Sequence, residues 1–248
     1  GWFDADRVRL SKERLDRLGY FETVTVDTPA VPTAPDQVDV NVTVKERATG
    51  NVQLGAGYSS SEGLVLTAGL SQSNLFGTGN ALALEVNTSK SNTVFSITHT
   101  DPYITPEGIS RTVELYYRNS DLAELGLASV GYNTRGAGLV YGIPFTEYDR
   151  VFLGLRYEGT QIDLTAQSPP RYIEYVQQFG DNSDALAVTG GWSRDSRDSL
   201  IVPTRGRYQR AFAEVAIPVL DLEYYRLTYQ FQQFFSFTRF FTLAFNTE

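Results

Sequence analysis

Residues 51–58 read Asn51-Val-Gln-Leu-Gly-Ala-Gly-Tyr58, so apolar side chains alternate with polar residues and glycines. A period of two places the apolar set on one face of a β-strand and the remaining residues on the other. The same alternation recurs along the rest of the chain. It predicts about eleven strands, each near the ~9–11 residues of a tilted spanning strand. They lie within residues 51–58, 64–70, 82–87, 92–100, 113–118, 136–143, 151–158, 186–192, 214–217, 226–231 and 241–246.

The connections between these strands differ in length. Residues 60–63 and 89–92 are tight, whereas residues 121–132 and 162–184 are long. If the first strand runs outward, both long connections fall at the same end, as a transmembrane barrel requires. The longer one should carry a short amphipathic helix, because four apolar residues after two prolines have helical spacing: Tyr172, Tyr175, Val176 and Phe179.

The first 46 residues have a different pattern. Asp4 is a candidate N-cap and Gly19 a candidate C-terminal cap for a helix between them. Alternating strands follow at residues 21–27 and 37–45, joined through prolines at 29, 32 and 35. This pattern predicts the helix and last two strands of a small α+β module. We therefore expect two units, residues 1–46 and residues 47–248.

Composition excludes some classes of protein. The net charge of −8 and the pI near 4.8 argue against a nucleic-acid partner, which needs a basic surface. No apolar run is long enough for a spanning helix, and a mean hydropathy of −0.23 fits a soluble β-protein or a transmembrane barrel. The chain begins at Gly1 without an apolar leader, so we expect a piece of a longer protein.

The aromatic residues favour the barrel over a soluble β-sandwich. Tyr and Phe number 15 each, and aromatic girdles mark the two bilayer interfaces of membrane barrels. Up-and-down closure also suits a series of strands joined mostly by short turns. The aromatic residues that cluster at strand ends are Tyr148, Tyr157, Tyr224, Tyr225, Phe234, Phe235, Phe240 and Phe241.

Catalytic and cofactor sites are not indicated. His99 is the only histidine, so a His-rich metal site is excluded, and on an alternating strand it is expected in the wall or lumen. Asp195 and Asp198 stand beside Arg194 and Arg197, a spacing better explained by local ion pairs than by paired catalytic carboxylates. We expect no enzyme activity, no metal and no cofactor.

Several strings resemble the BamA family of outer-membrane β-barrel assembly proteins, which combine periplasmic POTRA domains with a barrel. The first two resemble the end of a POTRA domain, and the others resemble the start of the barrel, in family order over the whole chain. The strings are Arg14–Phe21, Asp36–Glu46, Gly55–Gly63, Ser73–Gly79, Asp101–Tyr103, Arg194–Leu200 and Pro203–Arg210.

This resemblance implies a mainly β fold. It comprises an antiparallel transmembrane β-barrel, partial at about eleven of sixteen strands, preceded by a fragment of an α+β POTRA domain. It implies a bacterial outer-membrane protein with residues 1–46 in the periplasm. The implied function is the insertion and folding of β-barrel proteins, with nascent outer-membrane proteins, accessory assembly lipoproteins and outer-membrane lipid as partners. Two alternatives remain: a protein-translocating pore of the same superfamily (two-partner secretion or translocation and assembly), or the membrane barrel of an enzyme with its catalytic domain elsewhere.

The first barrel strand is the expected site of action. In the family, its weak seam with the last strand lets it pair with an incoming substrate strand, forming a lateral gate. Gly50, Gly55 and Gly57 favour easy opening, although inward glycines could instead make room for a plug in the lumen. Proline at Gln53 or Gly55 is expected to block pairing. The implied gate residues are Asn51, Val52, Gln53, Leu54, Gly55, Ala56, Gly57 and Tyr58.

Two groups of charged residues complete the candidate site. The first is expected to form charge pairs in the lumen that orient a plugging loop, unless its members are merely solvated: Glu85, Glu114, Arg118, Arg156, Glu158, Glu214 and Arg226. The second is expected either to contact the POTRA module at the periplasmic rim or to form only a solvated turn. Its members are Arg194, Asp195, Arg197, Asp198 and Arg205.

Overall fold

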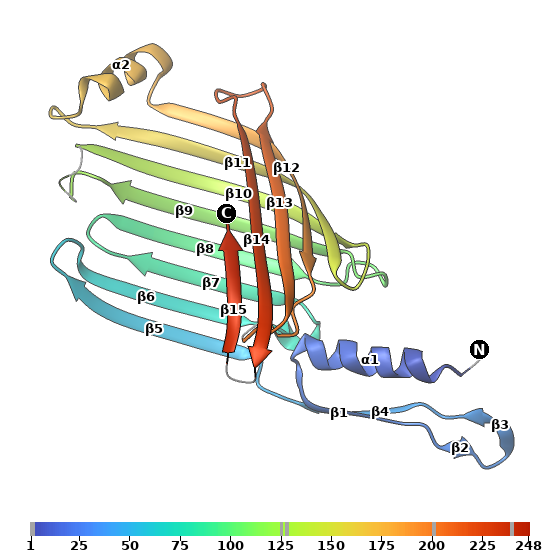
Figure 1. Ribbon diagram of the computed structural model, residues 1–248. Coiled ribbons are helices and arrows are strands. Elements are labelled where there is room, and N and C mark those ends of the chain that lie inside the picture. Colours follow the sequence, from blue (N-terminus) through green and yellow to red (C-terminus); the bar gives the residue numbers. More distant parts are fainter. Residues whose placement is uncertain (1–2, 125, 127–128, 200–201, 239–240) are drawn as a thin grey trace.

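The chain forms one large curved β-sheet, preceded by a small module of one helix and short strands (Figure 1). The computed structural model describes residues 3–248 except 125, 127–128, 200–201 and 239–240. None of the helices in this described part is both long and apolar enough to cross a membrane.

Helix α1 (Ala5–Leu18) has the two predicted caps. The Asp4 carboxylate accepts the backbone N–H groups of Asp6 and Arg7 at 3.0 and 3.2 Å, which satisfies two donors that the first helical turn leaves free. Gly19 ends the helix at φ 70°, a left-handed conformation that glycine adopts without strain.

The strands after α1 differ from the prediction in one respect. Strand β1 (Phe21–Asp27) pairs with β4 (Asn41–Glu46), and between them β2 (Ala30–Val31) pairs with β3 (Ala34–Val38). The single strand predicted over residues 37–45 is therefore wrong, because it is divided between β3 and β4. At the division the Asp39 N–H donates to the Pro29 carbonyl at 2.9 Å, which closes the outer hairpin. The alternation of valines continues through the break and hides it in the sequence.

The large sheet confirms the eleven predicted strands. They are antiparallel and lie in sequence order, each hydrogen-bonded to the next. A short 3-10 turn, η1 (Leu75–Gly77), stands between the second and third. Their bounds are β5 (Gly50–Ser59), β6 (Gly63–Gln72), β7 (Ala81–Thr88), β8 (Asn92–Asp101), β9 (Ser110–Asp121), β10 (Val130–Pro144), β11 (Asp149–Leu164), β12 (Asn182–Asp195), β13 (Gly206–Ala216), β14 (Tyr225–Thr238) and β15 (Phe241–Thr247).

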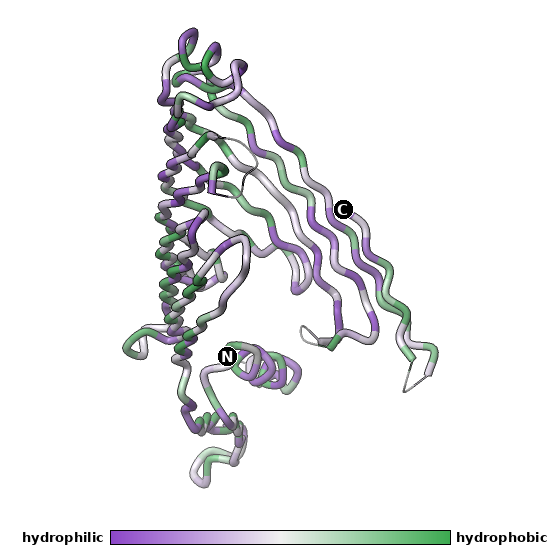
Figure 2. Tube along the Cα trace, turned by 90° about the vertical axis from the view of Figure 1, so that its left-hand side faces the viewer, coloured by the Kyte–Doolittle hydropathy of each residue, from purple (hydrophilic) through white to green (hydrophobic). Residues whose placement is uncertain are grey.

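The two faces of this sheet differ in polarity and burial. The sheet curls until β13–β15 pass in front of earlier strands (Figure 1), and hydrophobic and hydrophilic residues alternate along each strand (Figure 2). On the inner, concave face lie buried residues such as Ala187, Thr189 and Glu214. On the outer face lie exposed apolar residues such as Leu115 and Leu155, with no second sheet of the described residues packed on them. This is part of a β-barrel and not a soluble sandwich.

The two ends of the sheet can be named by the helices nearest to them. Both predicted long connections, 122–129 and 165–181, lie at the α2 end, which confirms that they share one end of the sheet. The second connection carries α2 (Pro170–Phe179), which confirms the predicted loop helix. At the α1 end, however, the turns 73–80, 102–109 and 196–205 are also long. Strands β9 to β12 have 12–16 residues, which is longer than expected. They extend past the apolar band into polar residues at the α2 end.

The predicted aromatic clusters are divided between the faces. Tyr225 and Phe235 are exposed on the outer face, whereas Tyr224 turns inward and donates to the Glu214 carboxylate at 2.9 Å. Consecutive strand residues point to opposite faces, so two aromatic residues in a row place one ring on the outer face, where the girdles lie, and the other ring on the inner face. Phe240 lies outside the described residues.

Gly154 should be required for the close packing of β11 against its neighbours. A Cβ at this position would lie 2.6 Å from the Leu139 carbonyl oxygen and 2.7 Å from Thr189 Oγ1, so the backbone must shift to admit it. We expect Gly154→Ala to lower the free energy of unfolding by about 1–3 kcal/mol. Urea denaturation of the full-length protein in micelles, followed by circular dichroism, measures this.

Gly190→Ala is the matched control, because a Cβ at Gly190 meets nothing within 4 Å. It should leave stability unchanged or raise it slightly by restricting the unfolded chain. Equal losses of stability in the two variants would contradict the packing role of Gly154.

Candidate functional site

Strand β5, the predicted gate, is an edge of the sheet. It pairs with β6, and no other strand of the described residues lies along its second edge. Its outward side chains are strongly exposed: Val52 by 66%, Leu54 by 79% and Tyr58 by 83%. An edge strand with unpaired backbone groups is a template for another strand. All eight predicted gate residues belong to this strand.

The pairing register identifies which backbone groups of β5 face the open edge. The Ser73 N–H donates to the Thr49 carbonyl at 3.1 Å, one step beyond the Gly50–Gln72 pair. In an antiparallel ladder, alternate residues direct both backbone groups to the same neighbour. Odd-numbered β5 residues therefore direct them toward β6. The residues with backbone groups toward the open edge are Val52, Leu54, Ala56 and Tyr58.

Side chains pack closely against the glycines of β5 at the α1 end and leave space at the α2 end. A Cβ on Gly50 would lie 2.6 Å from Gln72 Oε1, and Gln72 Nε2 donates to Thr49 Oγ1 at 2.7 Å. A Cβ on Gly57, in contrast, would meet nothing within 4 Å. The backbone ladder to β6 nevertheless continues to the α2 end, where Ser59 pairs with Gly63.

The tip of the β5–β6 hairpin is tied to the next hairpin. One Glu62 carboxylate oxygen accepts the hydroxyl groups of Ser89 and Ser91 at 2.7 and 2.5 Å. The hydrogen bonds from Ser91 and then Ser89 lower the pKa of the Glu62 carboxyl in this exposed turn. Because Glu62 contacts the β7–β8 turn, it positions β6 and leaves the free edge of β5 unobstructed.

The predicted lumen charges all lie on the inner face, and three of them meet. Glu214, only 2% exposed, lies 3.9 Å from Arg156 Nε and 3.8 Å from an Arg226 terminal nitrogen. These residues come from β13, β11 and β14. Tyr224 donates a hydrogen bond to the same carboxylate. The sequence pattern does not predict this contact, because Tyr224 and Tyr225 both fit an aromatic girdle.

Glu158 forms a second inner contact, with a tyrosine that the sequence analysis did not single out. The Tyr116 hydroxyl donates to Glu158, and its ring covers Gly136 on the strand between them. A Cβ on Gly136 would lie 2.2 Å from the ring, so the ring occupies the space that glycine leaves. The register pairs Tyr116 with Gly136, and this pairing is the signal that could have found the contact.

The remaining predicted lumen charges are dispersed. Glu85 lies on β7, and Glu114 and Arg118 lie on β9. For these three side chains, the described part of the chain shows no ion pair with an opposite charge. The sequence thus placed them on the correct face but could not show which of them pair.

His99 lies on β8 opposite Val113, on the outer face that Ile97 shares. It is therefore a wall residue.

The predicted rim residues form a self-contained turn. Asp195 pairs with Arg197 at 2.7 Å, and Asp198 accepts the backbone N–H groups of Thr204 and Arg205 at 2.8 and 3.1 Å. Arg194 lies 3.6 Å from Asp149 on the neighbouring strand. These contacts favour the interpretation as a turn.

Contacts between α1 and the sheet come from other residues. Arg14 of α1 pairs with Glu147 in the β10–β11 turn at 2.5 Å. The Tyr20 hydroxyl donates to the Gly79 carbonyl at 2.9 Å. Both partners lie at the α1 end, so the small module is fixed beside the ends of β6, β7, β10 and β11.

Glu214 should contribute to the stability of the curved sheet. Glu214→Ala leaves Arg156 and Arg226 facing each other without their shared carboxylate. We expect a loss of about 2 kcal/mol in the free energy of unfolding, below the value for a fully buried pair because Arg226 is 64% exposed. Urea denaturation measures it, with Glu114→Ala as the control on the same face. An equal effect of the two substitutions would exclude a special role for Glu214.

The turn at Asp198 should open in acid. Its hydrogen bonds from Thr204 and Arg205 lower the pKa of the Asp198 carboxyl from an ordinary value of 3.8 to about 2. A lowered pKa means that the carboxylate stabilises the turn above pH 3.8 and that this contribution is lost as the pH falls toward 2. Hydrogen exchange should show constant protection of the Thr204 and Arg205 amides from pH 7 to 4, and falling protection below. In Asp198→Ala their protection should be low at every pH. Equal protection of the two amides in Asp198→Ala and in the wild-type protein would contradict the role of the Asp198 carboxylate in this turn.

Comparison with known proteins matches both parts of the chain. The model described as "Omp85 superfamily domain" matches residues 74–248, and the POTRA model, described as "Surface antigen variable number repeat", matches residues 1–47. The outer membrane protein assembly factor BamA of Neisseria meningitidis is 37% identical over 256 residues, covering 99% of this chain and 32% of its own length. BamA of Nitratidesulfovibrio vulgaris is 29% identical over 213 residues, covering 86% of this chain and 26% of its length. The chain thus spans about a third of these curated relatives or less.

Solved structures show the same fold. The crystal structure of BamA from Haemophilus ducreyi lacking POTRA domains 1–3 aligns with a TM-score of 0.74 and 27% identity, over 100% of this chain and 50% of that one. CdiB from Acinetobacter baumannii aligns with a TM-score of 0.55 and 14% identity, over 89% and 42% of the two chains, and shows the fold alone. Residues 1–46 are periplasmic, so the α1 end of the sheet faces the periplasm and the α2 end the cell exterior. The chain belongs to the Omp85 superfamily of the bacterial outer membrane and is similar to its BamA members over its whole length.

Proposed function

We propose that this protein inserts and folds β-barrel proteins in the outer membrane, and that β5 acts as the template strand. The observation that carries the proposal is the register of β5, which directs the backbone groups of Val52, Leu54, Ala56 and Tyr58 away from β6 in a strand without proline or charged residues. The similarity to outer membrane protein assembly factors supports the coarser activity. Its substrates would be nascent outer-membrane proteins.

The physical need for a template follows from the bilayer. A backbone N–H or C=O without a partner costs several kcal/mol in the hydrocarbon region, so an isolated strand cannot enter it. An exposed edge in the membrane supplies those partners to an incoming strand by β-augmentation. The outward side chains of β5, such as the strongly exposed Leu54, would lie on the lipid face beside the side chains of such a strand.

Two further features support β5 in this role. The Glu62 contact ties the hairpin to β7 and β8 on the side away from the free edge. The contact of Gly50 with Gln72 holds the strand at its periplasmic end. Strand β5 is thus held toward β6 at both of its ends, which suits a strand that offers its second edge in a fixed position.

The other predicted groups have supporting roles in this proposal. The cluster of Arg156, Glu214 and Arg226 holds the later strands in their curve, and a plugging loop would meet it on the inner face. The rim residues of the Asp198 turn shape the periplasmic end. Accessory lipoproteins remain a prediction from the resemblance, and the module that contains α1 is where we expect them.

Proline substitution tests the template and must follow the register. Residue 53 directs its N–H toward β6, so Gln53→Pro breaks the β5–β6 ladder and should destabilise the barrel. Residue 55 directs its N–H toward β6 as well, so the expectation that proline at Gln53 or Gly55 blocks substrate pairing alone is wrong. Leu54→Pro removes an N–H from the open edge alone. We expect Leu54→Pro to retain a folded barrel and to slow the assembly of a substrate barrel by about tenfold or more, because one missing ladder bond also misplaces its neighbours.

The measurement is the rate at which the full-length protein, reconstituted in liposomes, folds a denatured outer-membrane substrate. Ala166→Pro is the control for proline itself, because Ala166 lies away from β5 in the turn that the Ser168 N–H closes on the Thr165 carbonyl, a position that proline favours. Normal assembly by Leu54→Pro would refute the template role of β5. If a translocating pore were the function, the wild-type protein would show clear single-channel conductance with a secreted partner and no folding of barrels.

A further inference from the structure

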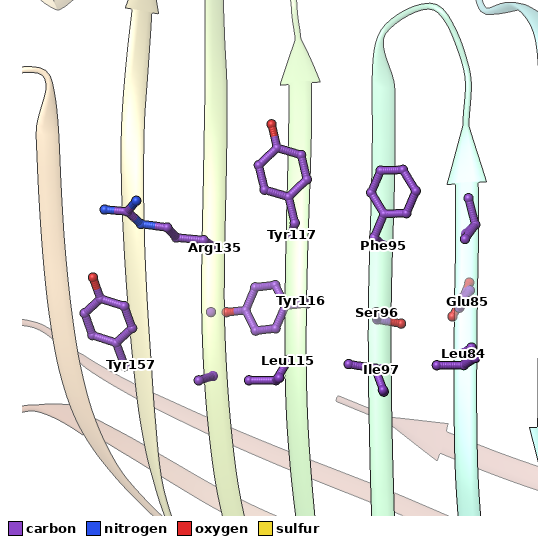
Figure 3. Close-up of a pocket in the computed structure, with 13 residues that line it drawn as sticks. Leu84, Glu85, Phe95, Ser96, Ile97, Leu115, Tyr116, Tyr117, Arg135 and Tyr157 are labelled. Atoms are coloured by element: carbon purple, nitrogen blue, oxygen red, sulfur yellow. The ribbon is translucent and has the colours of Figure 1, made fainter.

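A groove on the outer face crosses β7 to β11 and has an apolar lining. Its volume is about 600 Å³, and it opens toward the space that lipid occupies around a barrel. Figure 3 shows that the residues around the groove come from neighbouring strands. The residues that form its apolar walls and floor are Leu84, Val86, Phe95, Ile97, Leu115 and Ala137.

Polar groups gather at the exterior end of this groove. Tyr117 and Tyr157 direct their hydroxyl groups toward that end, and Arg135 extends from β10 above Tyr157 (Figure 3). The Tyr157 hydroxyl donates to the Asp184 carboxylate at 3.1 Å, and the Tyr117 hydroxyl donates to Asn133 Oδ1 at 3.0 Å. Both phenols are thus held in place by residues further from the membrane centre.

Gly159 leaves the space in which the charged groups converge. A Cβ on this glycine would lie 2.6 Å from Asp184 Oδ1, 3.1 Å from the Tyr157 hydroxyl and 3.2 Å from Arg135 Nε. A smaller recess of about 190 Å³ begins here, and it is lined by Arg135, Asp184 and other polar residues. The groove and the recess share Tyr117 and Arg135, so they form one continuous surface.

Arg135 and Asp184 lie close together without forming an ion pair. Among the described residues, no carboxylate lies within ion-pair distance of the Arg135 guanidinium, and none of the basic groups pairs with Asp184. A guanidinium prefers a phosphate or carboxylate partner, and a carboxylate can accept hydrogen bonds from an ammonium group. The two charges of opposite sign are therefore available to a ligand that carries both signs.

We propose that this surface is a binding site for a lipid whose headgroup contains a phosphate and a primary ammonium. One acyl chain occupies the apolar groove, the phosphate meets Arg135, and the ammonium enters the recess beside Asp184. The order of the three parts along the lipid matches their order along the strands, from the membrane centre to the exterior. The site lies on β7–β11, away from the open edge of β5, so it is independent of strand templating.

Native mass spectrometry of the delipidated full-length protein tests this site. Phosphatidylethanolamine, phosphatidylcholine and phosphatidylglycerol with the same acyl chains are compared at a low lipid-to-protein ratio. Phosphatidylcholine bears a bulkier, methylated ammonium, and phosphatidylglycerol has no ammonium. We expect phosphatidylethanolamine to bind about fivefold more strongly than either, a ratio typical of one charged contact near a membrane surface. Equal binding of the three lipids would overturn the proposal.

Two variants separate the parts of the headgroup. Arg135→Gln should weaken the binding of all three lipids, whereas Asp184→Asn should remove only the preference for phosphatidylethanolamine over phosphatidylglycerol. Arg118→Gln is the matched control, because Arg118 neighbours the Arg135 partner Tyr117 but lies on the opposite face. Circular dichroism confirms that each variant is folded. A preference that survives Asp184→Asn, or that Arg118→Gln also removes, would contradict the assignment.

Soluble phosphoethanolamine distinguishes a lipid from a free phosphate compound. The acyl chain contributes through the groove, so the soluble compound should not displace the lipid at equal concentration. Displacement under that condition would show that the groove has no part in binding and would overturn its assignment to an acyl chain.

Discussion

The need to pair every backbone N–H and C=O group within the bilayer governs this structure. The sheet meets that need for β6 to β14 by placing each strand between two antiparallel neighbours. At β5 the requirement is met on one side only, through β6. The sequence of β5 does not seal the open side, since it contains neither proline nor charged residues of the kind that protect natural edges. The same constraint that orders the rest of the sheet thus fits the proposed template role of β5, whose second side can bond another strand.

The period of two made most of the fold predictable from the sequence. All eleven strands of the sheet were located, because one face meets lipid and the other meets polar groups, so every strand repeats the same signal. The helix caps at Asp4 and Gly19 were also predictable, since capping depends on residues within one turn. The period of two did not locate strand ends where the alternation continues from one strand into the next, although the two strands pair with different neighbours. The division between β3 and β4 at Asp39 is such a place, because no residue type there marks it.

The parts of the site that could not be predicted depend on register across strands. Alternation assigned Glu158 and Glu214 to the inner face, but their partners Tyr116 and Tyr224 come from strands far apart in the sequence. Gly159 has meaning only because Arg135 and Asp184 flank it on adjacent strands. A shift of one residue in either pairing would send those groups to the other face. Sequence alone supplies the face of each residue, and the fold supplies its neighbours.

If β5 acts as the proposed template, its register also determines which alignment of an incoming strand fits the bilayer. On β5 the residues with backbone groups toward the open edge are the residues with side chains toward lipid, Val52, Leu54, Ala56 and Tyr58. Residues directly opposite each other in an antiparallel pair share a face. An incoming strand bonded to these residues therefore turns the opposing side chains toward lipid as well. A register shifted by one would expose its polar set to hydrocarbon, so the bilayer itself rejects the wrong alignment. The edge supplies the hydrogen bonds, and the lipid on one face determines which of the two registers is used.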